Sequence, residues 1–277
     1  MSCPMEREYS ERVLTMGICA YCGQDRKLTR EHITPNWMHR ANPEWNNYLG
    51  KIDKVVAADP VTKDVCEECN GGVLSGLDCY AKDLWQRYFS CFASAGEDLI
   101  FEYDYDLLAR WLLKISYNSA RAGSEAEWSG LVETVPYILG TGGRPFGLTV
   151  FMHLIIPHPV SRDEALVLNI DPAFLIAGGI APNMVRMEGY GVFSHDAPMS
   201  VSQRVIIRSY EFGLLVPATF EGKIEMALQN QAAKQLALPD GWAVLYPRNR
   251  KVRVRASDTT SFDVMENFVH DHPGLKF

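Results

Sequence analysis

The clearest hydrophobic pattern in this chain is helical and lies before its midpoint. Apolar residues recur at steps of three and four along residues 73–93 and again along 105–122, the spacing that places them on one face of a helix. An aspartate starts the second segment and Gly123 ends it, in agreement with the usual helix signals. A third helical piece is expected over 125–138. The pattern therefore predicts two long amphipathic helices and a shorter one.

Beyond residue 147 the pattern changes to short β-type runs, which Pro, Gly and Asp residues separate. The expected strands cover 148–156, 165–170, 184–193, 205–216, 242–246 and 251–256. The last two are expected to form a hairpin, and helices are expected at 220–236 and 257–271. His153 lies inside the first run, where a histidine is more often a satisfied core residue than a catalyst. Together these runs predict an antiparallel or mixed sheet.

The composition is that of a globular protein, and the patterns divide it into two parts. Of the 277 residues, 47% are hydrophobic and 22% are charged, as in soluble domains. An apolar run of about 18 residues, the mark of a membrane span, is absent from the sequence, so a cytoplasmic location is expected by elimination. We predict an α+β protein with an N-terminal module over 1–95. A mixed helix-and-antiparallel-sheet domain over 96–277 would recognise substrate, bind a protein partner or regulate the N-terminal module.

Two Cys-x-x-Cys pairs carry the first chemical signal, Cys19–Cys22 and Cys66–Cys69. Each pair brings two thiolates within one turn, and two pairs complete the tetrahedral four-sulfur site that structural zinc prefers. Gly23 follows the first pair, where a tight turn needs a residue without Cβ. Two disulfides and a thioredoxin-like redox motif are the alternatives. The lack of a secretory signal argues against the disulfides, and the presence of two pairs argues against the redox motif.

Between the pairs stands the run Glu31-His32-Ile33-Thr34-Pro35, and Asn70 directly follows the second pair. The order Cys-x-x-Cys, Glu-His-Ile-x-Pro, Cys-x-x-Cys-Asn resembles the HNH endonuclease family, in its variety with a four-cysteine zinc site. The resemblance covers about a quarter of the chain, residues 17–80. Any one of the three motifs is common, whereas their conjunction in this order is specific.

The resemblance implies a zinc-stapled ββα-metal module that cleaves phosphodiester bonds of nucleic acid, with DNA as the expected substrate. His32 would be the general base that takes a proton from water, a task that suits an imidazole at neutral pH. Glu31 and Asn70 would hold a catalytic Mg²⁺ or Mn²⁺ through oxygen atoms, as such ions require. Relatives of this type often serve bacterial or phage conflict systems, so a defence context is implied as well.

One feature departs from the family pattern. Many members carry a further asparagine a few residues before the second cysteine pair, where it orients the catalytic histidine. That place falls near Val61, and no asparagine stands there. A backbone carbonyl, Asn46 or Asn47 could orient His32 instead.

The charge balance is awkward for a nucleic-acid enzyme. The net charge is −7, whereas phosphate binding is largely electrostatic. The densest basic cluster consists of Lys251, Arg253 and Arg255, which alternate with valines and so share one strand face, together with Arg248 and Arg250. It is a candidate phosphate-contacting surface, and the alternative is a solvated edge strand whose charges resist aggregation.

One further candidate surface and two alternative function classes stay open. Lys114, Asn118 and Arg121 share one helix face, which could meet phosphate or could simply be solvated. The whole chain could be a non-catalytic zinc-stapled module that binds nucleic acid or protein. Finally, the zinc module could cap a C-terminal domain with its own activity. A deep pocket with converging polar groups would favour that last class.

Overall fold

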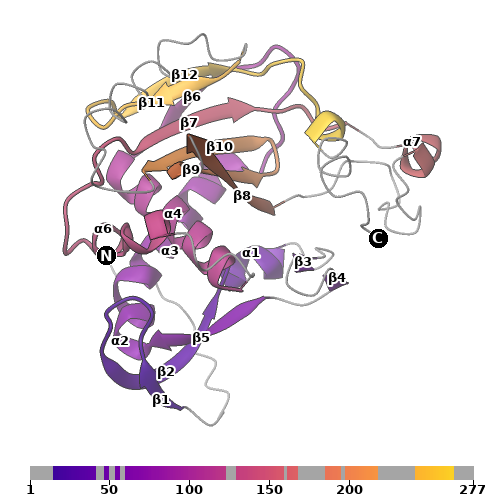
Figure 1. The fold of residues 1–277 in the computed structure, drawn as a ribbon. Coiled ribbons are helices and arrows are strands. Elements are labelled where there is room, and N and C mark those ends of the chain that lie inside the picture. The colour runs from indigo at the N-terminus through magenta and orange to yellow at the C-terminus, as the bar shows by residue number, and fades with distance from the viewer. Residues whose placement is uncertain are drawn as a thin grey trace.

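The computed structural model describes residues 15–41, 47–49, 54–56, 60–122, 129–158, 161–167, 185–194, 197–217 and 241–264. Over these residues the chain is a mixed helix-and-sheet protein whose strand ladders are antiparallel, so the α+β prediction is confirmed. Helices lie between a small N-terminal sheet and a larger sheet formed by the second half of the chain (Figure 1). No helix in this described part combines the length and apolar character needed to cross a membrane.

The small sheet has the order β1-β2-β5, with β2 in its centre. Its strands are β1 (Met16–Ile18), β2 (Asp25–His32) and β5 (Val61–Cys66). Helix α1 (Asn36–Ala41) follows β2, and β3 (Asn47–Leu49) pairs with β4 (Lys54–Val56). The register of β2 against β5 shifts between Thr29 and Glu31, and His32 then lies opposite Val61.

A nearly continuous helical segment leaves the small sheet. It consists of α2 (Glu67–Cys69), η2 (Asn70–Leu74), α3 (Ser75–Leu84) and η3 (Trp85–Phe89). The predicted bounds of this helix, 73–93, are thus too late at both ends. The start was missed because the first turn carries polar residues and two glycines instead of apolar ones. Gly72 has φ −101° and ψ −105°, which kinks the helix there. A Cβ built at Gly72 would meet no described atom within 4 Å. No other described backbone therefore packs closely against Gly72, and the glycine only loosens the turn.

Helix α4 (Tyr105–Ala122) has the predicted bounds and lies at the centre of the molecule. Strand β6 (Asp98–Glu102) precedes it. The expected helix over 125–138 is two short helices in the described residues, α5 (Ser129–Val132) and α6 (Val135–Leu139). The break is explained by Pro136, because proline lacks the amide hydrogen of a helix interior and is suited to a first turn.

The large sheet has the order β11-β7-β10-β9-β8. Its strands are β7 (Thr149–Leu154), β8 (Val185–Ser194), β9 (Ala197–Ile207), β10 (Tyr210–Pro217) and β11 (Ala243–Leu245). The predicted single strand 205–216 is the junction of β9 and β10. Arg208 makes that turn with φ 54°, a conformation that sequence rules expect of Gly, Asn or Asp.

A further strand prediction and the predicted hairpin are wrong. The expected strand 165–170 overlaps helix α7 (Arg162–Val167). That helix starts with a capping box, since Ser161 N donates to Glu164 Oε2 at 2.7 Å and Glu164 N donates to Ser161 Oγ at 3.2 Å. The expected C-terminal hairpin does not form either. Strand β11 pairs with β7, whereas β12 (Lys251–Arg255) pairs with β6.

Two helix predictions fall wholly or partly outside the described residues. The expected helix 220–236 lies entirely outside them. Of the expected helix 257–271, the structure describes residues 257–264, and a helical turn occupies 261–264.

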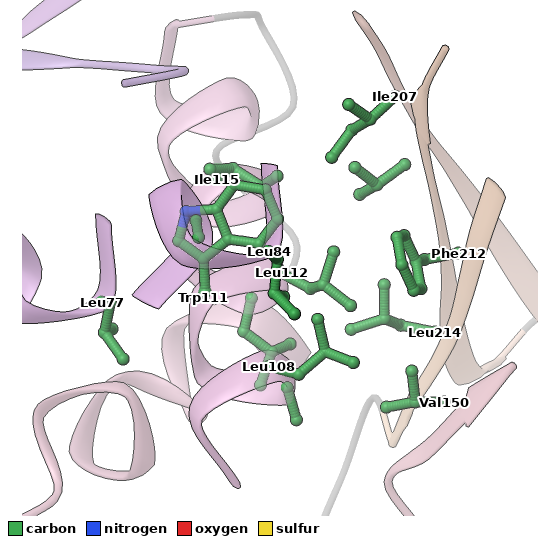
Figure 2. Close-up of a cluster of buried hydrophobic side chains, with 14 of the residues drawn as sticks. Leu77, Leu84, Leu108, Trp111, Leu112, Ile115, Val150, Ile207, Phe212 and Leu214 are labelled. Carbon is green, nitrogen blue, oxygen red and sulfur yellow. The ribbon is translucent and has the colours of Figure 1, made fainter. Parts of the chain in front are cut away.

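The core lies between α4 and the large sheet. Figure 2 shows Leu108, Leu112 and Ile115 of α4 facing Phe212 and Leu214 of the sheet. The same buried cluster extends into the small sheet and the cysteine pairs. The predicted boundary at residue 95 therefore crosses a shared core, and the division into two domains stays a prediction.

Candidate functional site

The four paired cysteines come together at one end of the small sheet. Cys19 and Cys22 lie in the turn between β1 and β2, Cys66 ends β5, and Cys69 lies in α2. Their sulfur atoms are all within 4.8 Å of one another, and the Sγ atoms of Cys22 and Cys66 are 3.7 Å apart. Four sulfurs about 2.3 Å from one zinc ion would be about 3.8 Å apart. The donor set therefore fits a structural zinc ion, and the six described cysteines form no disulfide.

The backbone of the Cys19–Cys22 turn, called the first knuckle below, supports this donor set. Gly23 adopts φ 68°, and its amide donates to the Cys19 carbonyl at 2.9 Å. Burial acts to raise the pKa of Cys19, but backbone amides of Cys22, Cys66 and Tyr21 outweigh it and lower that pKa to about 7. Burial raises the pKa of Cys66 and, further, that of Cys69. A bound metal would hold all four thiols deprotonated.

Glu31 contacts α4 through its carboxylate. Its side chain is buried, and its Oε1 lies 2.8 Å from Lys114 Nζ and 3.2 Å from Asn118 Nδ2. Lys114 Nζ lies 2.7 Å from Asp78 Oδ2 as well. Burial opposes the charge of Lys114, yet the two carboxylates outweigh burial and raise its pKa. Glu31 thus takes part in a buried network of opposite charges.

This network corrects the two interpretations of the α4 face. Lys114 and Asn118 are fully buried, and the side chain of Arg121 is only 8% exposed. The face is therefore neither solvated nor open to phosphate. It is polar because the small sheet presents acidic and hydroxyl groups to it, including Asp64, whose Oδ1 lies 2.5 Å from Arg121 Nη1.

Asn70 ties the start of the helical segment to β2. Its Nδ2 donates to Thr29 Oγ1 and to the Arg30 carbonyl, both at 2.9 Å. An oxygen ligand from Asn70 would therefore be Oδ1, because both amide hydrogens are directed at β2. His32, half-buried, ends the same strand. Glu31 and His32 are consecutive strand residues, so their side chains leave opposite faces.

A hard divalent ion finds fewer available ligand atoms at Glu31 than zinc finds at the four cysteines. A carboxylate oxygen has about two acceptor sites, and Lys114 and Asn118 both contact Oε1 of Glu31. The ammonium would also repel a divalent cation bound to that oxygen. Glu31 could therefore serve Mg²⁺ or Mn²⁺ only through Oε2. Of the substitutes considered for orienting His32, Asn46 and the side chain of Asn47 lie outside the described residues.

A second polar cluster lies in the large sheet. His153 Nδ1 is 2.8 Å from Glu211 Oε2, and its Nε2 is 2.6 Å from Ser257 Oγ. The order resembles a hydrolase triad, but Trp242 stacks on the imidazole with ring centroids 4.8 Å apart. A Cβ at Gly241 would lie 2.7 Å from that of Ser257, so the Gly241 backbone packs directly against the Ser257 side chain. His153 is thus the satisfied core histidine that the sequence predicted.

A cavity of about 390 Å³ lies elsewhere in the second half. It is lined by residues 144–149 and 244–247 and by Tyr105. Its one guanidinium, Arg144, lies over the Tyr105 ring, 5.3 Å from the centroid, and 3.6 Å from Asp106. The Tyr105 hydroxyl donates to the Leu148 carbonyl at 3.4 Å. These polar groups are occupied by each other, so the cavity gives little support to a separate activity.

Sequence reasoning missed the partners that α4 supplies to the Glu31-His32 run. The available signal was the step of four and three from Lys114 through Asn118 to Arg121, which places three polar residues on one face of the helix. Comparison with known proteins adds no relative to these observations: no family model, no curated protein and no solved structure matches the chain.

Proposed function

We propose that this chain is an HNH-type, metal-dependent endonuclease that cleaves phosphodiester bonds of nucleic acid, with DNA the expected substrate. The observation that carries the proposal is the convergence at the end of β2. Asn70 hydrogen bonds to β2 at Thr29 and Arg30, directly before Glu31 and His32. The cysteine pairs flank both segments, so one zinc ion would hold the turn before β2 and the start of the helix together.

His32 acts as the general base in this proposal. An imidazole at the end of a strand can take a proton from the water that attacks phosphorus. Asn70 Oδ1 and Glu31 Oε2 would hold Mg²⁺ or Mn²⁺, which supplies charge stabilisation at the leaving oxygen. Lys114 and Asn118 fix the Glu31 carboxylate from the other side.

The test is cleavage of plasmid and single-stranded DNA with Mg²⁺ or Mn²⁺, comparing the wild type with His32→Ala. We expect the wild type to cut and the variant to lose roughly a hundredfold to ten-thousandfold in rate, the usual contribution of a general base. Zinc content is measured in both proteins. His158→Ala is the matched control, because His158 is a half-exposed histidine paired with Glu164 in the second half of the chain. A His32→Ala protein as active as the wild type would exclude the assigned base.

A second candidate is a non-catalytic zinc-stapled module that binds nucleic acid or protein. The buried ion pair between Glu31 and Lys114 favours it, because that pair leaves a catalytic cation only one oxygen of the carboxylate. Binding of nucleic acid by the wild type and by His32→Ala, without cleavage under either metal, would support this candidate over the nuclease.

A further inference from the structure

The strand partner of His32 cannot orient it through a side-chain hydrogen bond. In the β2–β5 ladder His32 lies opposite Val61, whose isopropyl group carries neither donor nor acceptor. This is the place where the resemblance led us to expect an asparagine. A side chain that does hold the Glu31-His32 segment through hydrogen bonds lies on another element.

Asn118 of α4 supplies such a group. Its Nδ2 donates to Glu31 Oε1 and to the His32 carbonyl oxygen, both at 3.2 Å. Its Oδ1 accepts from the Tyr21 hydroxyl at 2.6 Å and from Arg121 Nη2 at 2.5 Å. Two donated and two accepted bonds are the full capacity of a side-chain amide, and this amide is completely buried.

The surroundings allow the amide only one orientation. A guanidinium can only donate, whereas a carboxylate and a backbone carbonyl can only accept. Reversing the amide would therefore direct its hydrogens at Arg121 and its oxygen at Glu31 and the His32 carbonyl. The Nδ2 group is thus held against the backbone of His32.

The partners of Asn118 connect it to the metal centre. Tyr21 lies between Cys19 and Cys22 in the first knuckle. Arg121, which also donates to Asn118, is paired with Asp64 on β5. One buried amide therefore bridges the cysteine turn, the end of β2 and, through Arg121, the facing strand.

We infer that Asn118 is a positioning residue that holds the Glu31-His32 segment in place from outside the zinc module, in the absence of an asparagine at the Val61 position. Its effect on cleavage rests on the proposed nuclease function, whereas its effect on His32 does not. Loss of the amide would displace the imidazole, and small displacements of a catalytic group cost roughly tenfold to a hundredfold in rate.

The test uses the full chain with zinc bound and compares three variants. Asn118→Leu removes the amide, and Tyr21→Phe removes only the hydroxyl that fixes it. Tyr117→Phe is the matched control, because its hydroxyl donates at 3.1 Å to the Ala20 carbonyl in the same knuckle and belongs to the neighbouring residue of α4. The readouts are the imidazole NMR signals of His32 and their titration, assigned with His32→Ala, together with kcat and KM.

We expect Asn118→Leu and, to a lesser extent, Tyr21→Phe to shift the His32 signals and lower kcat, while KM stays within about threefold. Tyr117→Phe should change neither readout. Unchanged His32 signals in a folded, zinc-replete Asn118→Leu would overturn the inference, as would an equal effect of the control. If Asn118→Leu does not fold, Tyr21→Phe decides. If the wild type does not cleave, the nuclease proposal fails, and the NMR comparison still decides the role of Asn118.

Discussion

Lys114 illustrates how strongly one buried residue depends on its partners. Its side chain is completely buried, with Nζ between Glu31 and Asp78. Removing one member of a buried charge network leaves the others unpaired in a medium of low dielectric constant, which typically costs about 3–5 kcal/mol. We therefore expect Lys114→Met to lower the free energy of unfolding by that amount in urea titrations. Lys82→Met is the control, since Lys82 is exposed on α3, and exposed substitutions stay within about 0.5 kcal/mol. Equal effects would contradict the network.

Glu211 gives a prediction for the pH dependence of stability. Burial alone would raise its pKa, but the His153 hydrogen bond and the Arg204 charge outweigh burial and hold that pKa below its ordinary value of 4.5. A carboxyl with a depressed folded-state pKa stabilises the protein fully above its unfolded pKa, and this stability is lost as pH falls through the folded pKa. Below pH about 5 the unfolding free energy of the wild type should therefore fall more steeply than that of Glu211→Gln. Parallel curves would contradict this assignment, and Glu102→Gln, at an exposed position, is the control.

At the scale of elements, the four-cysteine cluster joins the Cys19–Cys22 turn, β5 and α2. Removal of zinc, or Cys19→Ser, should release all three. Structural zinc supplies several kcal/mol of folding free energy, and 1 kcal/mol shifts Tm by roughly 2–4 °C in a chain of this size. We expect one zinc per chain by elemental analysis, and a Tm lower by about 10 °C or more after chelation. Cys91→Ser, at an exposed cysteine, should keep both values, and a Cys19→Ser protein with full zinc would refute the site.

Strand β12 carries the basic cluster, and its pairing favours a charge-balanced edge. Lys251 lies opposite Glu102, and Arg255 lies opposite Asp98. Opposite charges on paired strands attract each other. The two acidic residues also reduce the positive potential that a phosphate group would meet at β12. We expect Lys251→Gln/Arg255→Gln to leave the salt dependence of DNA binding unchanged. Lys27→Gln/Arg30→Gln, a matched pair of exposed cations on β2, should lower the slope by about 0.9 for each lost contact. The reverse result would make β12 the phosphate surface.

The elements differ in how well the sequence predicted them, for physical reasons. The cysteine cluster and α4 follow from local patterns, ligand spacing in one case and apolar periodicity in the other. The β9–β10 turn could not be found in this way, since Arg208 adopts a positive φ without being Gly, Asn or Asp. The role of Asn118 was also out of reach. Its partners Glu31 and Tyr21 are 87 and 97 positions away, and only the tertiary fold brings them to α4.

At the scale of the molecule, the main core of the described residues crosses the boundary predicted at residue 95. Leu77 and Leu84 of α3 belong to the same buried cluster as Trp111 of α4 (Figure 2). A fragment of residues 1–95 would expose this α3 face to water and would lack Lys114. It would keep the four cysteines, and so it should bind zinc without acquiring a packed core.

We therefore expect the zinc-bound 1–95 fragment to unfold over a broad temperature range and to bind a hydrophobic dye, as loosely packed states do, whereas the full chain unfolds cooperatively. Calorimetry of both proteins at equal zinc occupancy is the measurement. A sharp transition in the fragment, with calorimetric and van't Hoff enthalpies in agreement, would show that the zinc module is an autonomous domain. In that case the α4 contacts with Glu31 and Tyr21 would join two independently folded parts, and cleavage by the fragment alone would show that Asn118 is dispensable.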